Sequence, residues 1–378
     1  MARLRKATRQ NAETMILEDI ALTFVPQLGV RGAAHLLAEF GSASAIFAAS
    51  ADELRERAQL RDDVARSIVS KRGFDDAERE LEYCHRNNIT PIASTDSRYP
   101  SLLHEIEDYP TVLYVRGDIA SLRPRAVAFV GTRKMSAYGE RVCSELIGSL
   151  AEIVPDVVIV SGLAYGIDGA AHRAALAAGI TTVGVVANPL PHVTPTANEH
   201  LAAEIVGRGG AIVTELNSQA KQNGRFFIPR NRIIAGLCAG TVIVESSEVG
   251  GSLSTAAFAD GYNRSVMAVP GRISDANSRG CNILIRNKKA QAILSGRDIA
   301  AELLWELDLA DTPIHPTQKQ PLTEGEASLL ALFDQEPIHI DALLERSGLQ
   351  SGELSYLLMS LELSGAIRPL RGNMYEKL

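Results

Sequence analysis

Between about residues 91 and 300, short runs of apolar, often β-branched residues alternate with longer amphipathic stretches. Runs in which nearly every residue is apolar are typical of strands buried on both faces of a sheet. The amphipathic stretches predict helices that cover those faces. The pattern therefore predicts an α/β fold with a doubly wound parallel sheet. Its strands are expected at residues 126–130, 157–160, 181–187, 211–216, 241–246 and 266–270.

The first ninety residues have a helical periodicity instead. Apolar residues recur at spacings of three and four, with turns at Pro26–Gly29 and at Gly41, and predict a bundle of short helices over residues 1–90. Two helices joined by such a turn resemble the helix-hairpin-helix and SAM-like modules, some of which bind DNA phosphates through backbone N–H groups. The alternative interpretation is a packing module that binds no ligand.

The C-terminal part of the chain forms a third segment. Residues 311–321 are rich in Pro, Thr and Gln, which predicts a linker between the α/β domain at 91–310 and a tail at 322–378. Three helices followed by a short strand pair predict that the tail is a winged-helix domain. Such domains commonly place their last helix in the major groove of DNA.

The last predicted helix of this tail is poorly suited to contact DNA. It bears Glu353 and Glu362 and no Lys or Arg, so the phosphates of a duplex would repel it. A protein-interaction role is therefore the preferred interpretation of the helix. Two arginines of the predicted wing favour DNA instead, namely Arg368 and Arg371.

The net charge of −7 is unevenly distributed along the chain. Residues 301–378 hold thirteen acidic and five basic residues, whereas the first 300 residues hold the other 32 acidic and 33 basic residues. The body of the protein is thus close to neutral. An anionic ligand has to be met by a local cluster of cations, because no field of one sign covers the whole surface.

The sequence predicts a cytoplasmic protein. No apolar run approaches the ~18 residues of a membrane span, and the basic start MARLRKATRQNAETMI lacks the apolar core of a secretory signal. The cysteines have neither C-x-x-C spacing nor histidine pairs nearby, which favours reduced thiols over disulfides or a zinc site. These cysteines are Cys84, Cys143, Cys238 and Cys281.

Four of the predicted strands end in loops that contain glycine together with hydroxyl or cationic side chains. Ligands of doubly wound sheets bind beyond the carboxyl ends of the strands, so these loops are expected to lie together. Glycine lets the backbone approach a ligand, and free N–H groups at helix starts favour negative oxygen atoms. The candidate contacts are Gly131, Thr132, Arg133, Ser161, Gly162 and Ser252.

The segment RFFIPRNR at 225–232 places cations beside aromatic rings. Unpaired nucleic acid requires this combination, because a basic groove follows the phosphates while rings stack on the bases. Arg230 and Arg232 therefore predict an anion site, with Phe226 and Phe227 as stacking platforms.

The same segment also has a purely structural interpretation. Arg230 and Arg232 would then cap a helix or pair with carboxylates such as Glu215 and Glu245, and the two phenylalanines would be apolar cover. The anion site is preferred because four loops converge and one of them supplies a further cation, Arg133.

The predicted pocket lacks visible catalytic groups. The dinucleotide fingerprint G-x-G-x-x-G and the P-loop pattern G-x-x-x-x-G-K-[ST] are both absent. His172 is expected to pack in the core, and Asp168, four residues before it, is expected to complement the dipole of a helix. No nucleophile–base set and no metal-ligand cluster is evident. The sequence therefore predicts a binding protein without enzymatic activity, cofactor or metal.

Several motifs along the chain have the order and spacing of one known family. They are YPSLLHEIEDYPTVLYVRGD (99–118), VAFVGTRKMSAYG (127–139), VSGLAYGIDGAAHRAAL (160–176), PRNRIIAGL (229–237), GSLSTAAFA (251–259) and VPG (269–271). Over nearly its whole length the chain thereby resembles the DNA-processing protein A family, also called DprA or Smf. The resemblance implies an extended Rossmann-like domain that binds and protects single-stranded DNA and helps to load the RecA recombinase during natural transformation. A site made of phosphate contacts and stacking predicts binding without strong sequence preference.

The resemblance also assigns DNA-binding positions. The chain departs from the family pattern at Tyr165, where an arginine is common, and at Gly224, near a DNA-binding lysine for which Lys221 or Arg225 would substitute. The pocket implied by the family consists of Gly131, Thr132, Arg133, Ser161, Gly162, Arg230, Asn231 and Arg232. Possible additional contacts are Lys221, Arg225, Phe227 and Ser252.

A homodimer is expected because handover of a long strand to RecA requires more than one pocket. The apolar stretch SVMAVP at 265–270 is the last predicted strand and a candidate edge for this contact, through Val266 and Val269. The alternative is that both valines are buried beneath a neighbouring helix.

The competing functional interpretation is enzymatic. The stretch VGGSLSTA at 249–256 is faintly similar to the signature loop of the lysine-decarboxylase-like nucleoside-monophosphate phosphoribohydrolases. The catalytic glutamate of those enzymes has no counterpart after Gly251, where Ser252 and Leu253 follow. A purely scaffolding role is a third interpretation.

Overall fold

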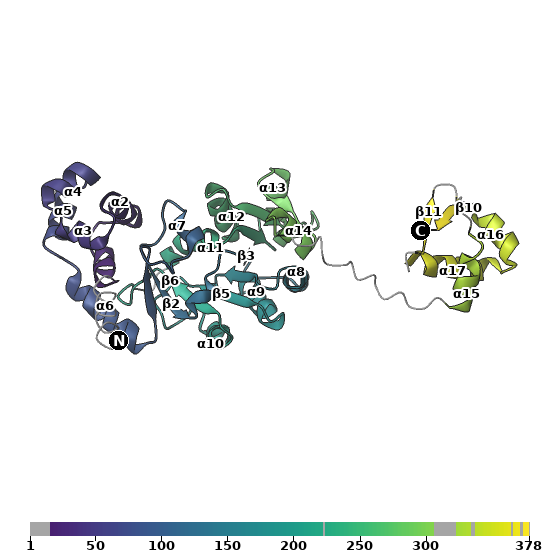
Figure 1. The fold of residues 1–378 in the computed structure, drawn as a ribbon, viewed down its shortest axis with the longest axis horizontal. Coiled ribbons are helices and arrows are strands. Elements are labelled where there is room, and N and C mark those ends of the chain that lie inside the picture. Colours follow the sequence, from purple (N-terminus) through teal and green to yellow (C-terminus); the bar gives the residue numbers. More distant parts are fainter. Residues whose placement is uncertain are drawn as a thin grey trace, which may run out of the picture. The chain divides into compact units, whose positions relative to one another are not determined.

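The structure is a computed structural model that describes residues 16–221, 224–305, 323–333, 337–363, 366–370 and 373–377. The chain divides into two compact units, Met1–Leu307 and Asp308–Leu378, whose elements are labelled in Figure 1. The predicted linker at 311–321 and the wing residue Arg371 lie outside the described residues.

Within the described residues, the larger unit contains a nine-stranded sheet in the order β1-β2-β6-β5-β4-β3-β7-β8-β9. All neighbouring strands from β6 to β9 are parallel, which confirms the predicted doubly wound sheet. The parallel strands are β3 (Ala126–Val130), β4 (Val158–Ser161), β5 (Thr181–Val185), β6 (Ala211–Thr214), β7 (Gly240–Ile243), β8 (Ser265–Ala268) and β9 (Gln291–Ala292).

One edge of the sheet is antiparallel, which the sequence pattern did not predict. Strands β1 (Thr90–Ala93) and β2 (Val112–Gly117) pair with each other, and β2 pairs with β6, all in antiparallel register. Antiparallel neighbours need no helical crossover, and the connection between β1 and β2 holds only the one-turn helix α7 (Ser101–His104).

Helices cover both faces of the parallel strands, because the side chains of a strand alternate between faces. In β3, Ala128 and Val130 pack in one apolar cluster, whereas Val127 and Phe129 pack in the cluster on the opposite face. The first face is covered by α11 (Phe227–Gly236), α12 (Ser252–Gly261) and α13 (Arg279–Arg286), and the second by α8 (Ala137–Ile153), α9 (Ile167–Ala177) and α14 (Gly296–Glu302).

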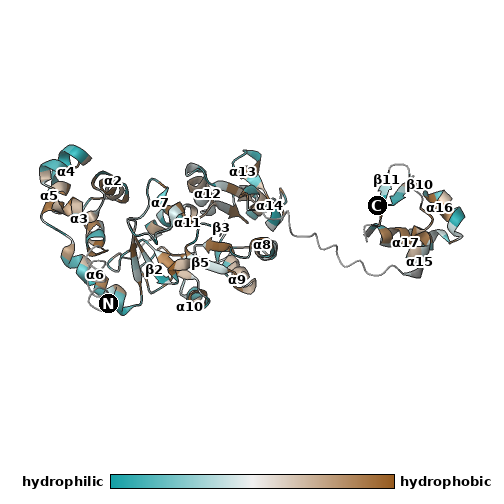
Figure 2. Cartoon of the chain, viewed as in Figure 1, coloured by the Kyte–Doolittle hydropathy of each residue, from teal (hydrophilic) through white to brown (hydrophobic). Residues whose placement is uncertain are grey.

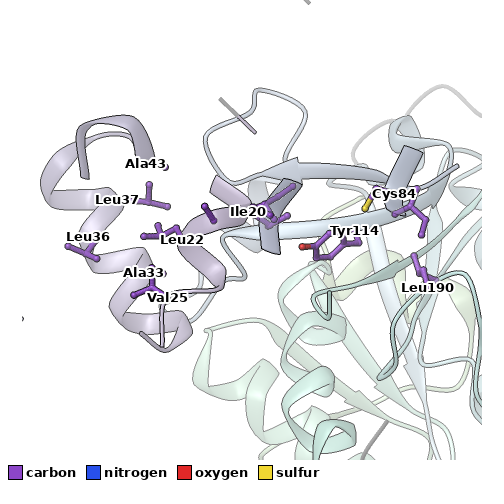
Figure 3. Close-up of a cluster of buried hydrophobic side chains, with 14 of the residues drawn as sticks. Ile20, Leu22, Val25, Ala33, Leu36, Leu37, Ala43, Cys84, Tyr114 and Leu190 are labelled. Atoms are coloured by element: carbon purple, nitrogen blue, oxygen red, sulfur yellow. The ribbon is translucent and has the colours of Figure 1, made fainter. Parts of the chain in front are cut away.

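The N-terminal helices share a core with the antiparallel edge of the sheet. One apolar cluster joins residues of these helices, such as Ile20 and Leu36, to Tyr114 of β2 and Leu190, as Figure 3 shows. Helix α10 (Glu199–Gly207) contributes to the same cluster. The N-terminal helices span residues 16–23, α2 (Val30–Phe40), α3 (Ala43–Ala48), α4 (Ala51–Ala58), α5 (Asp62–Val69) and α6 (Phe74–Arg86).

Asp19 is a charged residue inside this shared core. It is 4% exposed and its Oδ1 atom has no hydrogen-bond partner. The pKa of Asp19 is raised to about 7, chiefly by burial and in addition by the nearby carboxylates of Glu18 and Asp96. The folded state therefore favours the protonated acid.

Replacing Asp19 with asparagine is expected to change how stability depends on pH. Because the pKa of Asp19 is higher in the folded state than in the unfolded state, protonation of Asp19 stabilises the fold. This stabilisation is fully present below about pH 4 and is lost as the pH rises towards and through 7. Asp19→Asn should therefore raise the free energy of unfolding at pH 8 by roughly 4 kcal/mol relative to its effect at pH 4. Urea unfolding at both values measures this difference, and an identical pH dependence in both proteins contradicts the assignment.

The smaller unit has the winged-helix arrangement. Its helices α15 (Glu324–Leu330), α16 (Ile340–Ser347) and α17 (Ser351–Leu363) pack around a core that includes Leu343 and Leu361. Within the described residues, a short strand β10 (Ile338–His339) joins the predicted pair β11 (Ile367–Leu370) and β12 (Met374–Lys377) in the order β10-β12-β11.

In the larger unit, Figure 2 shows hydrophobic residues on the strands of the sheet and hydrophilic residues on the outer helices α4 and α6.

The prediction that β8 forms an edge of the sheet and a dimer contact is wrong. Strand β9 pairs with β8, so β8 is not the last strand of the sheet. Val266 is 8% exposed and packs in the cluster on one face, while Val269 is 4% exposed and packs in the cluster on the other. The side chains of both valines belong to the monomer's core, as the alternative interpretation anticipated.

Candidate functional site

Several loops at the carboxyl ends of the parallel strands enclose a pocket of about 400 Å³. The loops follow β3, β4 and β7, and the N-terminal turns of α11 and α12 complete the wall. The pocket lies where ligands of doubly wound sheets bind. Its lining consists of Val130, Gly131, Thr132, Arg133, Ala164, Asp168, Phe227, Ile228, Arg230, Asn231, Ile234, Ser247, Gly250, Gly251, Ser252 and Thr255.

A cation and an aromatic ring lie together at this pocket. The guanidinium carbon of Arg133 lies 5.1 Å from the centroid of the Phe227 ring, within the range of a cation–π contact. Arg133 is exposed, and the neighbouring Ile228 is 60% exposed. The structure therefore brings together the two side chains that a phosphate and an unpaired base require.

Two buried side chains of opposite charge lie at the floor of the pocket. Arg230 and Asp168 are 6% and 7% exposed. The Arg230 Nη1 group donates hydrogen bonds to the carbonyl oxygens of Gly162, at 2.7 Å, and Val185. Burial lowers the pKa of Arg230 to about 10 and raises the pKa of Asp168, while each charge opposes the shift of the other. Arg230 thus remains a cation at neutral pH and holds two strand exits in place.

Packing requires glycine at two positions, one that lines the pocket and one beside it. A Cβ atom on Gly162 would lie 2.6 Å from Asp168 Oδ2 and 2.7 Å from Arg230 Nη2. A Cβ atom on Gly131 would lie 2.6 Å from Ile167 Cγ1. Glycine at these positions allows the loops to pack against the side chains of Asp168 and Arg230 and against helix α9. This reason is distinct from the predicted close approach of a ligand.

The loops after β3 and β7 are joined to each other. The backbone N–H of Thr132 donates to the carbonyl oxygen of Glu245 at 2.8 Å. The Glu245 carboxylate accepts hydrogen bonds from the backbone N–H and the hydroxyl of Ser136, at 2.9 and 2.5 Å, at the start of α8. Glu245 therefore stabilises a helix start and does not pair with an arginine.

The polar side chains on the other wall also hold one another. Asn231 Nδ2 donates to Ser254 Oγ at 2.9 Å, and Asn231 Oδ1 accepts from Arg230 Nε at 3.2 Å. Ser252 is 8% exposed and its hydroxyl donates to Ser246 Oγ at 2.9 Å. Asn231 and Ser252 line the pocket as predicted, and existing hydrogen bonds fix their orientation.

Arg232 does not belong to this pocket. Its Nη2 group donates to the Glu215 carboxylate at 2.6 Å, and its Nε atom lies 3.6 Å from Asp108 Oδ2. The side chain lines a different groove. The structural alternative, a pairing with Glu215, is therefore the arrangement that the structure has.

Four other predicted residues lie outside the pocket lining. Ser161 is fully buried and its hydroxyl donates to the Phe129 carbonyl oxygen at 2.6 Å, so it holds two strands together. Gly162 contributes through the carbonyl that Arg230 contacts. Lys221 and Arg225 are exposed on the segment that precedes α11.

The sequence did not single out Ile228, Ser247 and Thr255 as pocket residues. Ile228 directly follows the aromatic pair Phe226–Phe227. Its place in the sequence, between the predicted contacts Phe227 and Arg230, could have indicated that it lines the pocket. Ser247 and Thr255 lie on either side of the predicted contact Ser252 in the sequence.

His172 has a structural position. It is fully buried, and its Nδ1 atom lies 2.7 Å from Thr182 Oγ1. The pKa of His172 is lowered to about 3, chiefly by burial and in addition by the charges of Arg173 and Arg230. The ring is therefore neutral at physiological pH.

The described part of the chain has neither a metal-ligand cluster nor a membrane-spanning helix. No three His, Cys, Asp or Glu side chains gather there as they would around a metal ion. No helix among the described residues has the length and apolar character needed to cross a membrane. The cysteines named above are all buried and unpaired.

An open doubly wound sheet with a partly cationic pocket at its carboxyl edge defines a Rossmann-like binding protein. The model of the family described as DNA recombination-mediator protein A matches residues 90–304, and that of the DprA winged-helix domain matches residues 313–373. The chain belongs to this family, DprA or Smf.

Individual relatives agree with this assignment. Protein Smf of Escherichia coli (strain K12) is 34% identical over 299 residues, which cover 78% of this chain and 79% of that protein. The crystal structure of DNA processing protein A from Streptococcus pneumoniae matches with a TM-score of 0.60 and 33% identity, over 67% of this chain and 87% of that one. A Helicobacter pylori structure, described in terms of the single-stranded DNA binding mode of its DNA processing protein A, matches with a TM-score of 0.51 and 28% identity, over 58% and 96%.

Proposed function

We propose that this protein binds single-stranded DNA at the pocket around Arg133 and Phe227, without strong sequence preference. The observation that carries the proposal is the Arg133 guanidinium lying over the Phe227 ring at the mouth of the pocket. Arginine contacts phosphate in any sequence, and every base presents a face to an aromatic ring. The single-stranded DNA binding of the Helicobacter pylori relative supports the same conclusion.

The proposed role continues with protection of the strand and its transfer to the RecA recombinase in the cytoplasm, during DNA uptake and recombination. The protein would act as a homodimer, since two pockets hold a longer strand than one. No contact residues are assigned to the dimer, because Val266 and Val269 are buried.

The winged-helix unit is proposed to contact a protein partner. Helix α17 presents Glu353 and Glu362 on its exposed surface, and these carboxylates repel phosphate. Tyr356 and Met359 of the same helix are 73% and 63% exposed, as is typical of a helix face that binds another protein.

The experiment that tests the proposed function measures binding and catalysis together. A fluorescent 30-nucleotide single strand should bind at physiological salt more tightly than a duplex of the same sequence and should resist nuclease digestion. Incubation with nucleoside monophosphates should release no free base, which separates the proposal from the phosphoribohydrolase alternative. RecA filaments should form faster on strands coated with this protein. Base release, or equal binding of duplex and single strand, contradicts the proposal.

A further inference from the structure

A second hollow lies between the N-terminal helices and the sheet. Its volume is about 630 Å³, in the range of small-molecule sites. We call it the hairpin groove, because the turn between the first two N-terminal helices forms one wall. It is lined by Thr23, Leu28, Gly29, Val30, Arg31, Ala33, Asp108, Pro110, Thr111, Val112, Glu215, Leu216, Asn217, Ala220, Phe226, Pro229 and Arg232.

The hairpin groove opens on the same edge of the sheet as the Arg133 pocket. Its wall includes the residues that follow β6, and β6 is parallel to β5 and β4. It also includes the start of β2, which is antiparallel to β6 and therefore begins at that edge. Both hollows thus lie along the carboxyl edge of one sheet, where neighbouring strands are about 4.8 Å apart.

The first turn of α11 separates the two hollows. Phe227 and Arg230 line the Arg133 pocket, whereas Phe226 and Pro229 line the hairpin groove. The ridge between them includes Ile228, which is 60% exposed. A strand that crosses this ridge reaches both hollows, because a helix with its side chains is only about 10–12 Å thick.

The chemistry of the hairpin groove suits a base better than a phosphate. Its charged residues cancel, since Arg31 and Arg232 are matched by Asp108 and Glu215. Most of the remaining lining is apolar, as in sites for flat uncharged rings.

Some polar groups at the floor of the groove can form further hydrogen bonds. Arg232 is 6% exposed and its Nη1 group has no hydrogen-bond partner. The carboxylates of Asp108 and Glu215 lie 3.6 and 2.6 Å from its other nitrogens. Tyr262 donates to Asp108 Oδ1 at 2.6 Å, which fixes the direction of that carboxylate. Each carboxylate can accept further hydrogen bonds.

We propose that the hairpin groove is a nucleobase subsite, which receives a base of the same strand whose phosphate contacts Arg133. The inference rests on the proposed single-strand binding and extends it to the N-terminal helices. The base lies between the hairpin turn and the sheet edge, against Phe226 and Pro229. Asp108 and Glu215 accept hydrogen bonds from exocyclic amino groups, so bases that carry one are held better than thymine.

The test combines a substitution that fills the groove with a strand that carries no bases. Val30 is 36% exposed on the groove wall, so Val30→Trp occupies the groove without disturbing the core. Val69→Trp is the matched control, since Val69 is 46% exposed at the end of α5. Binding is measured by anisotropy at low salt, with an octamer of deoxycytidine and with an octamer of abasic nucleotides.

We expect Val30→Trp to weaken binding of the cytosine octamer at least about fivefold, the lower limit for loss of one base contact. It should change binding of the abasic octamer less than about twofold, and Val69→Trp should change neither. Equal effects of Val30→Trp on both octamers, or none on either, overturn the subsite while leaving the proposed function intact. Failure of the unmodified protein to bind either octamer overturns both.

A second measurement applies whether or not the tryptophan variant folds. A cytosine octamer with one 5-iodo-substituted pyrimidine is photo-crosslinked to the unmodified protein, and the modified peptide is identified by mass spectrometry. Crosslinks within residues 23–33 or at Phe226 are expected. Crosslinks confined to the Arg133 pocket contradict the subsite.

Discussion

Replacing Arg230 with alanine is expected to lower the free energy of unfolding by about 3–5 kcal/mol, as is typical when a buried charge loses the opposite charge that compensates it. The substitution would leave the Asp168 carboxylate buried without its cation. It would also remove the hydrogen bonds to the carbonyl oxygens of Gly162 and Val185, which join two strand exits. Urea unfolding of the variant measures the loss.

The control for this prediction is Arg133→Ala, at an exposed cation of the same pocket. Its free energy of unfolding should stay within about 0.5 kcal/mol of the unmodified protein, as is usual for surface substitutions. An Arg230→Ala variant as stable as the control would show that the Arg230 guanidinium is not part of the scaffold. The sequence predicted Arg230 and Arg232 as anion ligands, whereas the burial of both side chains gives them a structural role.

Arg133→Ala should instead weaken binding of single-stranded DNA. A charge-assisted hydrogen bond to phosphate is typically worth about 1.5–3 kcal/mol, which corresponds to a loss of roughly 10- to 150-fold in affinity. Phe227→Ala should weaken binding by a comparable amount, since stacking of one base contributes about 1–3 kcal/mol. The effects of the two substitutions should not add, because the side chains are in contact. Fluorescence anisotropy with a labelled single strand measures both losses.

The parallel sheet could be predicted because its sequence signal is local. The runs around Val127 and Ile159 are apolar at every position, which only strands buried on both faces require. Their loops were expected to converge, since all parallel strands end at one edge. That topological rule placed Gly131, Thr132 and Arg133 in the pocket without any knowledge of side-chain directions.

The two arginines of the segment PRNR were predicted to share one site because they are close in the sequence, and this prediction was wrong for Arg232. Both lie on helix α11, two positions apart, and residues at that spacing do not share a face of a helix. Arg230 therefore reaches the pocket floor while Arg232 reaches Glu215 and Asp108. Helical geometry applied to that segment would have separated them in advance.

Strand β8 is an interior strand only because β9 pairs with it, and the residues of β9 have no strand pattern in the sequence. Strand β9 has two residues, Gln291 and Ala292, neither of which favours a strand in isolation. Its pairing with β8 is set by the surrounding tertiary structure. The antiparallel strand β1 was missed for a similar reason, since its four residues include Pro91 and are too few for a periodic signal.

The salt dependence of single-strand binding tests the central claim most directly. The logarithm of the binding constant should fall linearly with the logarithm of salt concentration, by about 0.7 for each phosphate contacted in a single strand. Arg133→Ala is expected to lower the affinity and to make this slope shallower by about 0.7, while the variant unfolds at the same urea concentration as the unmodified protein. An unchanged affinity together with an unchanged slope would show that Arg133 contacts no phosphate and would contradict the proposed binding site.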